Sequence, residues 1–310
     1  MKNHNYLPSK ILEGNERALA KAISMIENQE KEGIEILKKL YKKGGKAKVI
    51  GFTGPPGAGK STIIQCLASI LSERSKVGII AVDPTSPFTG GALLGDRIRM
   101  QNLFTNPNIF IRSMATRGSI GGLAPMTLDV VDLLDIAGYE WILVETIGVG
   151  QDEVDVAMCV EEVVVVLVPG LGDEIQALKA GIMEIGDIFV INKADKDGSE
   201  LTYMEIKNFL EMEGNKDKMP KIVKTKAISM EGISELAEIL KDDLKRKEKE
   251  KNLTEKKKNQ LKTRLFQMLT KEFQNVFNQK KELEKTIEDL FWRKTDPYTA
   301  VEVLKKEILC

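Results

Sequence analysis

The sequence is poor in the residues that many enzymes use for nucleophilic and metal chemistry. Of its 310 residues one is histidine, His4, and three are cysteines, Cys66, Cys159 and Cys310, which lie far apart. A structural zinc site needs clustered cysteine or histidine ligands, and Ser–His or Cys–His catalysis needs a histidine, so the sequence argues against both. Three separated cysteines also make no disulfide framework. Carboxylates, lysines, backbone amides and a hard cation remain as candidates for chemistry.

The chain also lacks net charge and long apolar runs. Its 46 Lys and Arg balance 46 Asp and Glu, which removes a whole-chain attraction to nucleic acid or an anionic membrane. The longest apolar run is Val163–Val168, whereas a membrane-spanning helix needs about 20 residues. The N-terminal sequence MKNHNYLPSK has no apolar stretch typical of a signal sequence. We therefore expect a globular cytoplasmic protein with neither nucleic acid nor membrane as a partner.

Three different patterns of apolar residues divide the chain into predicted segments. Residues 1–45 show apolar residues at helical spacing and indicate an N-terminal helical extension. Residues 46–242 alternate short apolar runs with helical segments, which predicts an α/β domain whose mostly parallel central sheet is flanked by helices. Residues 243–310 read as a C-terminal helical arm. The predicted strands are Ala47–Phe52, Val77–Val82, Ile109–Arg112, Trp141–Glu145, Val163–Val168, Ile188–Asn192 and Ile222–Thr225.

The predicted arm begins in a densely charged stretch, Lys241–Lys258, which indicates a solvated helix or hinge, with a basic docking surface as the alternative. Apolar residues at helical spacing follow it, and Asp296-Pro297 is a good N-cap and first-turn pair for a last helix. These stripes predict an arm that packs on the core or on a second copy of the chain. Their members are Leu261, Leu265, Leu269, Phe273, Val276 and Phe277, then Leu283, Ile287, Leu290 and Phe291.

Residues Gly54–Ser61, with the sequence GPPGAGKS, match the P-loop pattern G-x-x-x-x-G-K-[ST]. The motif follows an apolar run and opens a helical segment, as a P-loop should. In such a loop the backbone N–H groups of Gly57, Ala58, Gly59, Lys60, Ser61 and Thr62 surround the phosphates. Lys60 would neutralise the β- and γ-phosphates, and the Ser61 hydroxyl would bind Mg²⁺.

Magnesium prefers oxygen ligands, so further carboxylates should stand at strand ends that face the P-loop. Asp83 and Glu145 each end an apolar run, and Asp96 lies in a glycine-rich loop. Each acid alone is equally well explained as an ordinary turn residue. Together, downstream of a P-loop, they are candidate magnesium ligands.

The sequence Asn192-Lys193-Ala194-Asp195 follows the predicted strand Ile188–Asn192 and matches N-K-x-D. In P-loop GTPases the Asp carboxylate of this motif accepts hydrogen bonds from guanine N1–H and the 2-amino group, and the Lys stem covers the ring. Adenine offers no such donor pair and would leave the carboxylate unpaired. We therefore expect GTP and GDP, rather than ATP, to be bound.

With these motifs the chain resembles the acyl-CoA-mutase-associated GTPases of the MeaB/ArgK type, which include the human methylmalonic-aciduria type A protein and belong to the SIMIBI class of P-loop GTPases. The likeness covers nearly the whole length in ordered blocks. Besides the two motifs above, these blocks are Gly14–Ile23, Ala81–Ser86, Leu94–Arg97 with Arg99-Met100, Arg117-Gly118, Gly121-Gly122, Glu145–Gln151, Pro169–Gln176 and Asp296–Ala300.

The resemblance implies a homodimer supported by the C-terminal arm. It also implies a chaperone whose GTP binding and hydrolysis gate cobalamin loading and protection of methylmalonyl-CoA mutase, isobutyryl-CoA mutase or another acyl-CoA mutase. By the same likeness Ser61, Asp83, Asp96 and Glu145 form the Mg²⁺ site, and Lys60, Asp83, Glu145 and Lys179 serve hydrolysis. Lys179 lies with Asp173, Glu174 and Gln176 in a switch loop, and Gln151 resembles a switch residue.

One block departs from the family pattern. Where the family usually has Ser-Ala-Leu in its second guanine loop, this chain has Lys226-Ala227-Ile228. That loop recognises the base largely through backbone amides, so the three residues are still expected to bind nucleotide. The mutase has to be a separate chain, because no cobalamin-binding domain is fused here.

Three alternatives remain open at this point. A nickel metallochaperone GTPase shares the class but needs Cys/His ligands. A nucleotide-driven kinase or energiser of basic amino-acid transport is a label that the family has carried. An adaptor that binds GTP without turnover is the non-enzymatic alternative.

Overall fold

The computed structural model describes residues 6–83, 100–115, 125–146, 160–170, 182–212, 219–250, 252–278 and 281–309. The chain forms two compact units, Met1–Lys257 and Lys258–Cys310. The predicted boundary between residues 242 and 243 therefore falls inside a helix of the first unit, α11 (Ile233–Lys249).

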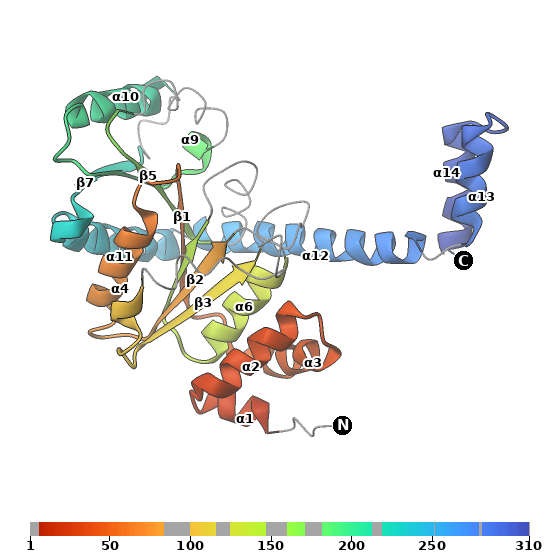
Figure 1. The fold of residues 1–310 in the computed structure, drawn as a ribbon, viewed down its shortest axis with the longest axis horizontal. Coiled ribbons are helices and arrows are strands. Elements are labelled where there is room, and N and C mark those ends of the chain that lie inside the picture. The colour runs from red at the N-terminus through yellow and green to blue at the C-terminus, as the bar shows by residue number, and fades with distance from the viewer. Residues whose placement is uncertain are drawn as a thin grey trace. The chain divides into compact units, whose positions relative to one another are not determined.

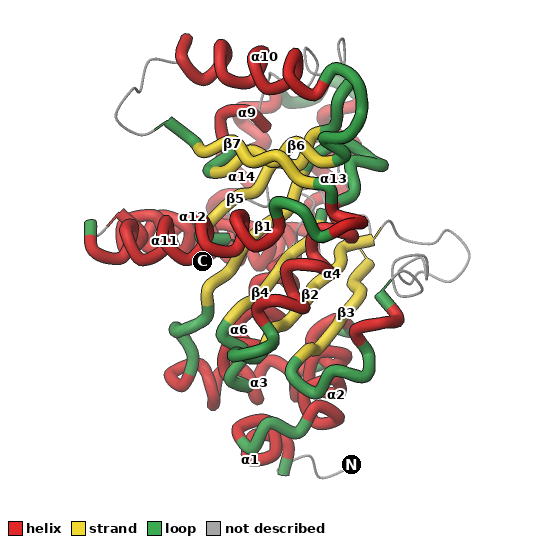
Figure 2. The backbone as a smooth tube through the Cα atoms, turned by 90° about the vertical axis from the view of Figure 1, so that its left-hand side faces the viewer, coloured by secondary structure: helices red, strands yellow, loops and turns green. Residues whose placement is uncertain are grey.

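The first unit is built on a seven-stranded parallel sheet with the strand order β3-β2-β4-β1-β5-β6-β7 (Figure 1 and Figure 2). The predicted fold class is confirmed, and all seven predicted strands are present. Two of them match to the residue, and the others shift or extend by one to three positions. The strands are β1 (Lys48–Thr53), β2 (Val77–Asp83), β3 (Ile109–Ala115), β4 (Trp141–Glu145), β5 (Glu162–Leu167), β6 (Ile188–Asn192) and β7 (Lys221–Thr225).

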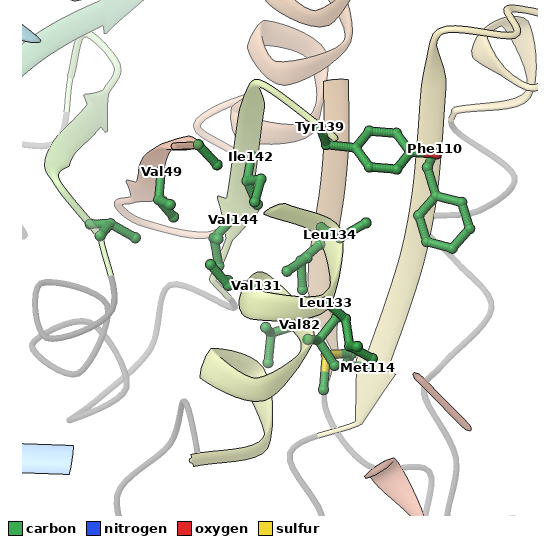
Figure 3. Packing of buried hydrophobic residues seen from close by; sticks show 14 of the residues in the cluster. Val49, Val82, Phe110, Met114, Val131, Leu133, Leu134, Tyr139, Ile142 and Val144 are labelled. Atoms are coloured by element: carbon green, nitrogen blue, oxygen red, sulfur yellow. The ribbon is translucent and has the colours of Figure 1, made fainter. Parts of the chain in front are cut away.

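Helices cover both faces of this sheet, which explains why its strands are almost continuously apolar. On one face, Phe52 of β1 packs in a cluster with α4 (Lys60–Leu71) and α11. On the other face, β4 packs against α6 (Pro125–Ile136), and Val131 of α6 lies beside Val144 (Figure 3). The remaining helices of this unit are α1 (Leu7–Leu12), α2 (Glu16–Glu27), α3 (Lys31–Leu40), α9 (Ile182–Ile185) and α10 (Ser199–Met212), with 3₁₀ turns η1 (Tyr41–Lys43), η2 (Gln101–Leu103) and η4 (Ala227–Ser229).

The N-terminal helices are part of the sheet's core. Asn15 caps α2, its side-chain oxygen accepting a hydrogen bond from Ala18 N at 3.0 Å. Most of their apolar residues at helical spacing are buried in the cluster that includes α6, namely Leu19, Ala22, Ile23, Ile26, Ile36 and Leu40. Arg112 of β3 forms an ion pair with Glu27 of α2, which ties this layer to the sheet edge.

The second unit contains most of α12 (Asn252–Asn278), with α13 (Lys281–Phe291) and α14 (Pro297–Leu309). The predicted Asp296 cap is confirmed, since its Oδ1 accepts from Tyr298 N at 2.9 Å and Thr299 N at 3.0 Å. No helix in the described ranges combines the length and apolar character needed to cross a membrane.

Candidate nucleotide site at the carboxyl edge of the sheet

The loop Gly54–Gly59 connects β1 to α4 and needs glycine at two of its positions. Gly54 has φ +130°, and a Cβ there would lie 2.1 Å from the backbone oxygen of Val166. Gly59 has φ +94°, and its Cβ would lie 2.3 Å from Asn192 Nδ2. Both the backbone conformation and the close neighbours exclude a larger side chain. Gly54 and Gly59 of the predicted P-loop are thus required by the packing of this sheet edge.

Lys60 is the first residue of α4 and is buried beneath the loop. Its Nζ donates hydrogen bonds to the backbone oxygens of Gly54 at 2.7 Å and Pro55 at 3.2 Å. The ammonium group is therefore held inside the curve of the loop, at the N-terminus of a helix. Both the lysine charge and the helix N-terminus favour an anion at this place.

Ser61 and Glu145 meet beside the P-loop. The Ser61 hydroxyl donates to Glu145 Oε1 at 2.6 Å, and Glu145 is buried at the end of β4. In the register of the sheet, Glu145 stands opposite Phe52 of β1 and Ala81 of β2. A carboxylate is thus placed next to the first turn of α4.

These two oxygen-bearing side chains fit a magnesium ion, because Mg²⁺ takes oxygen ligands and usually keeps several waters. Asp83 ends β2, which pairs with β4 in the sheet. Asp96 lies outside the described residues. Among the residues that the structure describes, no three His, Cys, Asp or Glu side chains are gathered as a metal site, so the fit depends on the contact between Ser61 and Glu145.

Asn192 joins three loops at this edge. Its Nδ2 donates to the backbone oxygen of Ala58 at 2.9 Å. Its Oδ1 accepts from Thr225 Oγ1 at 3.1 Å and from Ala227 N at 3.2 Å. The side chain is buried, so these hydrogen bonds fix the P-loop, the end of β6 and the end of β7 relative to one another.

The rest of the N-K-x-D motif lies over the P-loop and toward solvent. Lys193 has φ +56°, and its Nζ donates to the backbone oxygen of Gly57 at 2.9 Å. Asp195 is exposed, and the carboxylate makes no hydrogen bond or ion pair with the described residues. The motif's lysine thus contacts the P-loop, and the predicted base-recognition carboxylate of Asp195 is exposed to solvent.

The second guanine loop packs against the same place. Ala227 is buried, its backbone oxygen accepts from Cys66 Sγ of α4 at 3.2 Å, and the Ile228 side chain is 94% exposed. Burial raises the pKa of the Cys66 thiol, which keeps it a donor at neutral pH. Lys226 Nζ contacts Glu231 Oε1 at 3.0 Å and Oε2 at 2.8 Å.

The structure brings together most of the predicted site. Lys179, Asp173, Glu174, Gln176 and Gln151 lie outside the described residues. For Asp83 only the backbone is described, and Thr62 follows Ser61 in the first turn of α4. Cys66, Thr225 and Glu231 also contact this site, but they belong to no motif and their place in the site could not be predicted from sequence. The residues that do gather at this edge are Gly57, Ala58, Gly59, Lys60, Ser61, Glu145, Asn192, Lys193 and Ala227.

Three features define the P-loop GTPase class: an all-parallel sheet, a P-loop that opens a helix, and an N-K-x-D loop hydrogen-bonded to that P-loop. Comparison with known proteins identifies the family within this class. The family model described as methylmalonyl-CoA mutase-associated GTPase MeaB matches residues 19–282. The chain therefore belongs to the MeaB family and is a GTPase, as the sequence analysis predicted.

Individual relatives agree with this. A protein of Pyrococcus abyssi whose name describes it as a GTPase is 44% identical over 311 residues, which cover 98% of this chain and 96% of that protein. A mitochondrial methylmalonic aciduria type A homolog of Mus musculus is 35% identical over 252 residues, 75% of this chain and 61% of that protein. The solved structure of a LAO/AO transport system kinase matches with a TM-score of 0.69 at 22% identity over 100% of both chains, and this likeness shows the fold.

Proposed function

We propose that this GTPase is a chaperone for a cobalamin-dependent acyl-CoA mutase, of the methylmalonyl-CoA or isobutyryl-CoA type. In this role GTP binding and hydrolysis gate the loading of cobalamin and the protection of the mutase. The observation that carries the proposal is the match to a family described as mutase-associated, over residues 19–282. The methylmalonic aciduria type A homologs of mouse and worm support it by their names.

The proposed nucleotide contacts follow from the site. The backbone N–H groups of residues 57–62 bind the phosphates, and Lys60 exchanges its contacts with the loop carbonyls for phosphate oxygens. Asp195 accepts from guanine N1–H and the 2-amino group, while the Lys193 stem, held on Gly57, covers the base. Residues 226–228 complete the base site through their backbone.

For hydrolysis we assign Ser61 and Glu145, with Asp83 and Asp96, to hold Mg²⁺ and its water shell. The chemistry that Mg²⁺ would supply at these residues is neutralisation of negative charge on the phosphates. Lys60 neutralises the γ-phosphate as charge shifts in the transition state, and the P-loop amides donate to the same oxygens. Lys179 is our candidate for assisting hydrolysis.

GTP turnover by the purified protein tests this function, measured alone and with each candidate cobalamin-dependent mutase, with ATP as the control. We expect slow turnover of GTP alone and stimulation by one mutase. Lys60→Ala should lower single-turnover hydrolysis by about 100-fold or more, because it removes a charge aimed at the transferred phosphate. GTP turnover that no mutase alters would overturn the chaperone proposal while leaving the GTPase in place.

We also propose that the C-terminal helices form a homodimer. In α12 the residues Leu261, Leu265, Leu269, Phe273 and Val276 recur every three or four positions and are 43–68% exposed. Apolar residues on one helical stripe indicate burial against a partner helix. Light scattering should give twice the chain mass for the wild type and the chain mass for Leu265→Glu/Leu269→Glu. A wild-type monomer at micromolar concentration would contradict the dimer.

The transport-kinase alternative has one structural relative in its favour, the LAO/AO kinase structure, but that likeness extends to the fold only. A kinase of that kind would use ATP. Competition between GTP and ATP for the site therefore separates the two functions, because Asp195 should select guanine.

A further inference from the structure

A lysine stands beside the carboxylate that is proposed to recognise guanine. Strands β6 and β7 end side by side, with Asn192 opposite Thr225 in the register. Beyond them, Ala194 N donates to the backbone oxygen of Thr225 at 3.1 Å. Asp195 follows Ala194 and Lys226 follows Thr225, so this contact places Asp195 and Lys226 as neighbours beside the proposed base site.

This arrangement creates a competition. An ammonium group near a carboxylate pairs with it, and Lys carries three donors on a flexible stem. A carboxylate of Asp195 that is paired with Lys226 would have to give up that pair before it could accept from guanine N1–H and the 2-amino group. Base binding would then be weaker by the free energy of the pair.

Glu231 holds the lysine elsewhere. Both of its carboxylate oxygens accept from Lys226 Nζ, at 3.0 and 2.8 Å. The backbones of the same two residues are also paired, because Lys226 N donates to the backbone oxygen of Glu231 at 3.0 Å. The hydrogen bonds that Lys226 donates to Glu231, and the charge of Glu231, raise the pKa of Lys226, with a smaller contribution from the charge of Asp195.

The turn that presents Glu231 is itself fixed. Met230 has φ +63° and Gly232 has φ +79°, and a Cβ on Gly232 would lie 2.2 Å from the backbone oxygen of Lys224. Within the turn, Met230 N donates to the backbone oxygen of Ala227 at 3.2 Å. The backbone positions of Glu231 and Lys226 are thus fixed relative to each other.

We propose that Glu231 is a specificity-determining positioning residue, which holds the Lys226 ammonium so that the Asp195 carboxylate stays available for guanine. This inference rests on the base-recognition role proposed for Asp195. It adds to that role a residue that touches neither base nor phosphate.

The test is a double-mutant cycle on nucleotide affinity, with GDP and inosine diphosphate as probes, the latter lacking the 2-amino group. Glu231→Gln keeps the shape but loses the charge that holds Lys226. We expect it to weaken GDP binding about 2- to 5-fold, the range of an exposed ion pair. The ratio of GDP to inosine diphosphate affinity should fall as well, because GDP loses two hydrogen bonds and the probe loses one.

The decisive comparison is the same change in the background Lys226→Met, which keeps the stem and removes the ammonium. There Glu231→Gln should have no effect on either probe, because the ammonium that Glu231 holds has been removed. In the protein that keeps Lys226, the loss of GDP affinity caused by Glu231→Gln should become smaller between 50 and 500 mM salt. An equal loss of affinity in both backgrounds, or no loss in either, would overturn the inference.

Asp195→Asn keeps this result separate from the proposed function. An amide at that position offers a donor to the 2-carbonyl of xanthine, so the variant should lose GDP and gain xanthosine diphosphate. If it does so and the cycle shows no coupling, only the role of Glu231 fails. If Asp195→Asn leaves base preference unchanged, the guanine-recognition role fails and this inference fails with it. Thermal melts of all the variants check that they fold.

Discussion

The two edges of the central sheet use polar residues in opposite ways. At the carboxyl edge, side chains such as Asn192 and Lys60 bind backbone oxygens of the loops. At the amino edge, Glu162 at the start of β5 and Asp187 just before β6 are neutralised by lysines from far along the chain. Lys247 Nζ lies 2.8 Å from Glu162 Oε2 and 2.6 Å from Asp187 Oδ1.

The amino edge continues this pattern into the next helix. Lys256 Nζ lies 3.4 Å from Asp187 Oδ2 and donates to the Glu161 backbone oxygen at 2.7 Å. Lys257 Nζ lies 2.5 Å from Glu161 Oε1. These contacts attach the end of α11 and the start of α12 to the sheet. The charged stretch predicted to be a solvated helix or hinge thus supplies partners for buried carboxylates.

This difference in bonding indicates a different role for each edge of the sheet. Around the P-loop, hydrogen bonds fix the backbone so that its N–H groups and an exposed carboxylate can face a ligand. In the amino-edge cluster, defined as Glu161, Glu162, Asp187, Lys247, Lys256 and Lys257, the charges are matched within the protein. Changes at the first edge should therefore alter nucleotide binding, and changes at the second should alter stability.

The largest expected effect is at the amino edge, from Lys247→Met. The change leaves the buried carboxylate of Glu162 and the half-buried carboxylate of Asp187 without their closest cation, which should lower the free energy of unfolding by about 3–5 kcal/mol. Urea denaturation at pH 8 measures it. Lys245→Met on the exposed face of the same helix is the matched control and should change stability by about 0.5 kcal/mol or less.

The same variants also test whether the two edges are separate in function. Lys247→Met that remains folded should bind GDP with near wild-type affinity, because Lys247 contacts only the amino edge. A selective loss of GDP affinity, with unchanged unfolding, would show that the two edges are not separate in function.

The next effect is at the carboxyl edge, from Asn192→Ala. Removing the amide leaves Ala58 O and Ala227 N without their partner and frees the P-loop from the base loops. We expect GDP affinity to fall about 10- to 100-fold, corresponding to about 1–3 kcal/mol for the lost hydrogen bonds. Isothermal titration calorimetry with GDP measures it. Asn192→Asp, which still accepts from Ala227 N but places a buried carboxylate oxygen against Ala58 O, should lose at least as much affinity.

Asn106→Ala is the control for that change. Asn106 also links separate segments, donating to Ser72 Oγ at 3.0 Å, but it lies before β3 and away from the P-loop. It should lower stability and leave GDP affinity unchanged. Equal losses of GDP affinity in the Asn106 and Asn192 variants would mean that both act through general stability.

The strands and the phosphate and base motifs could be predicted from sequence because their causes are local. The strands β4 and β6 match the prediction to the residue, since burial on both faces demands an apolar run that polar residues interrupt at its ends. Likewise the P-loop glycines and Lys60 follow from the conformation and charge that phosphate binding requires.

The side-chain contacts that could not be predicted join residues distant in the sequence. Cys66 and Ala227 are 161 positions apart, and Lys247 and Glu162 are 85 apart, so no local spacing reveals either contact. The start of β5 illustrates the consequence. The predicted strand begins with the apolar run at Val163, yet Glu162 lies in the strand with its carboxylate buried against Lys247.

The last expected effect, at most about 1.4 kcal/mol per pH unit, concerns pH at the amino edge, where two influences on Glu162 oppose each other. Burial and the charge of Asp187 raise the pKa of Glu162 to about 7, while Lys247 acts to lower it and Asp243 adds to the rise. Between its ordinary value near 4.5 and about 7, the folded protein therefore keeps a proton that the unfolded chain has lost. Stability should fall as the pH rises through this window and level off above it.

The measurement is the difference in unfolding free energy between the wild type and Glu162→Gln, followed from pH 5 to pH 8. The difference should decrease by at most about 1.4 kcal/mol per pH unit, because one proton is involved. Subtraction removes the parallel contribution of Glu161, whose pKa burial also raises. A difference that increases with pH would mean that attraction to Lys247 outweighs burial and Asp187, and that the cluster is held together by its ion pairs alone.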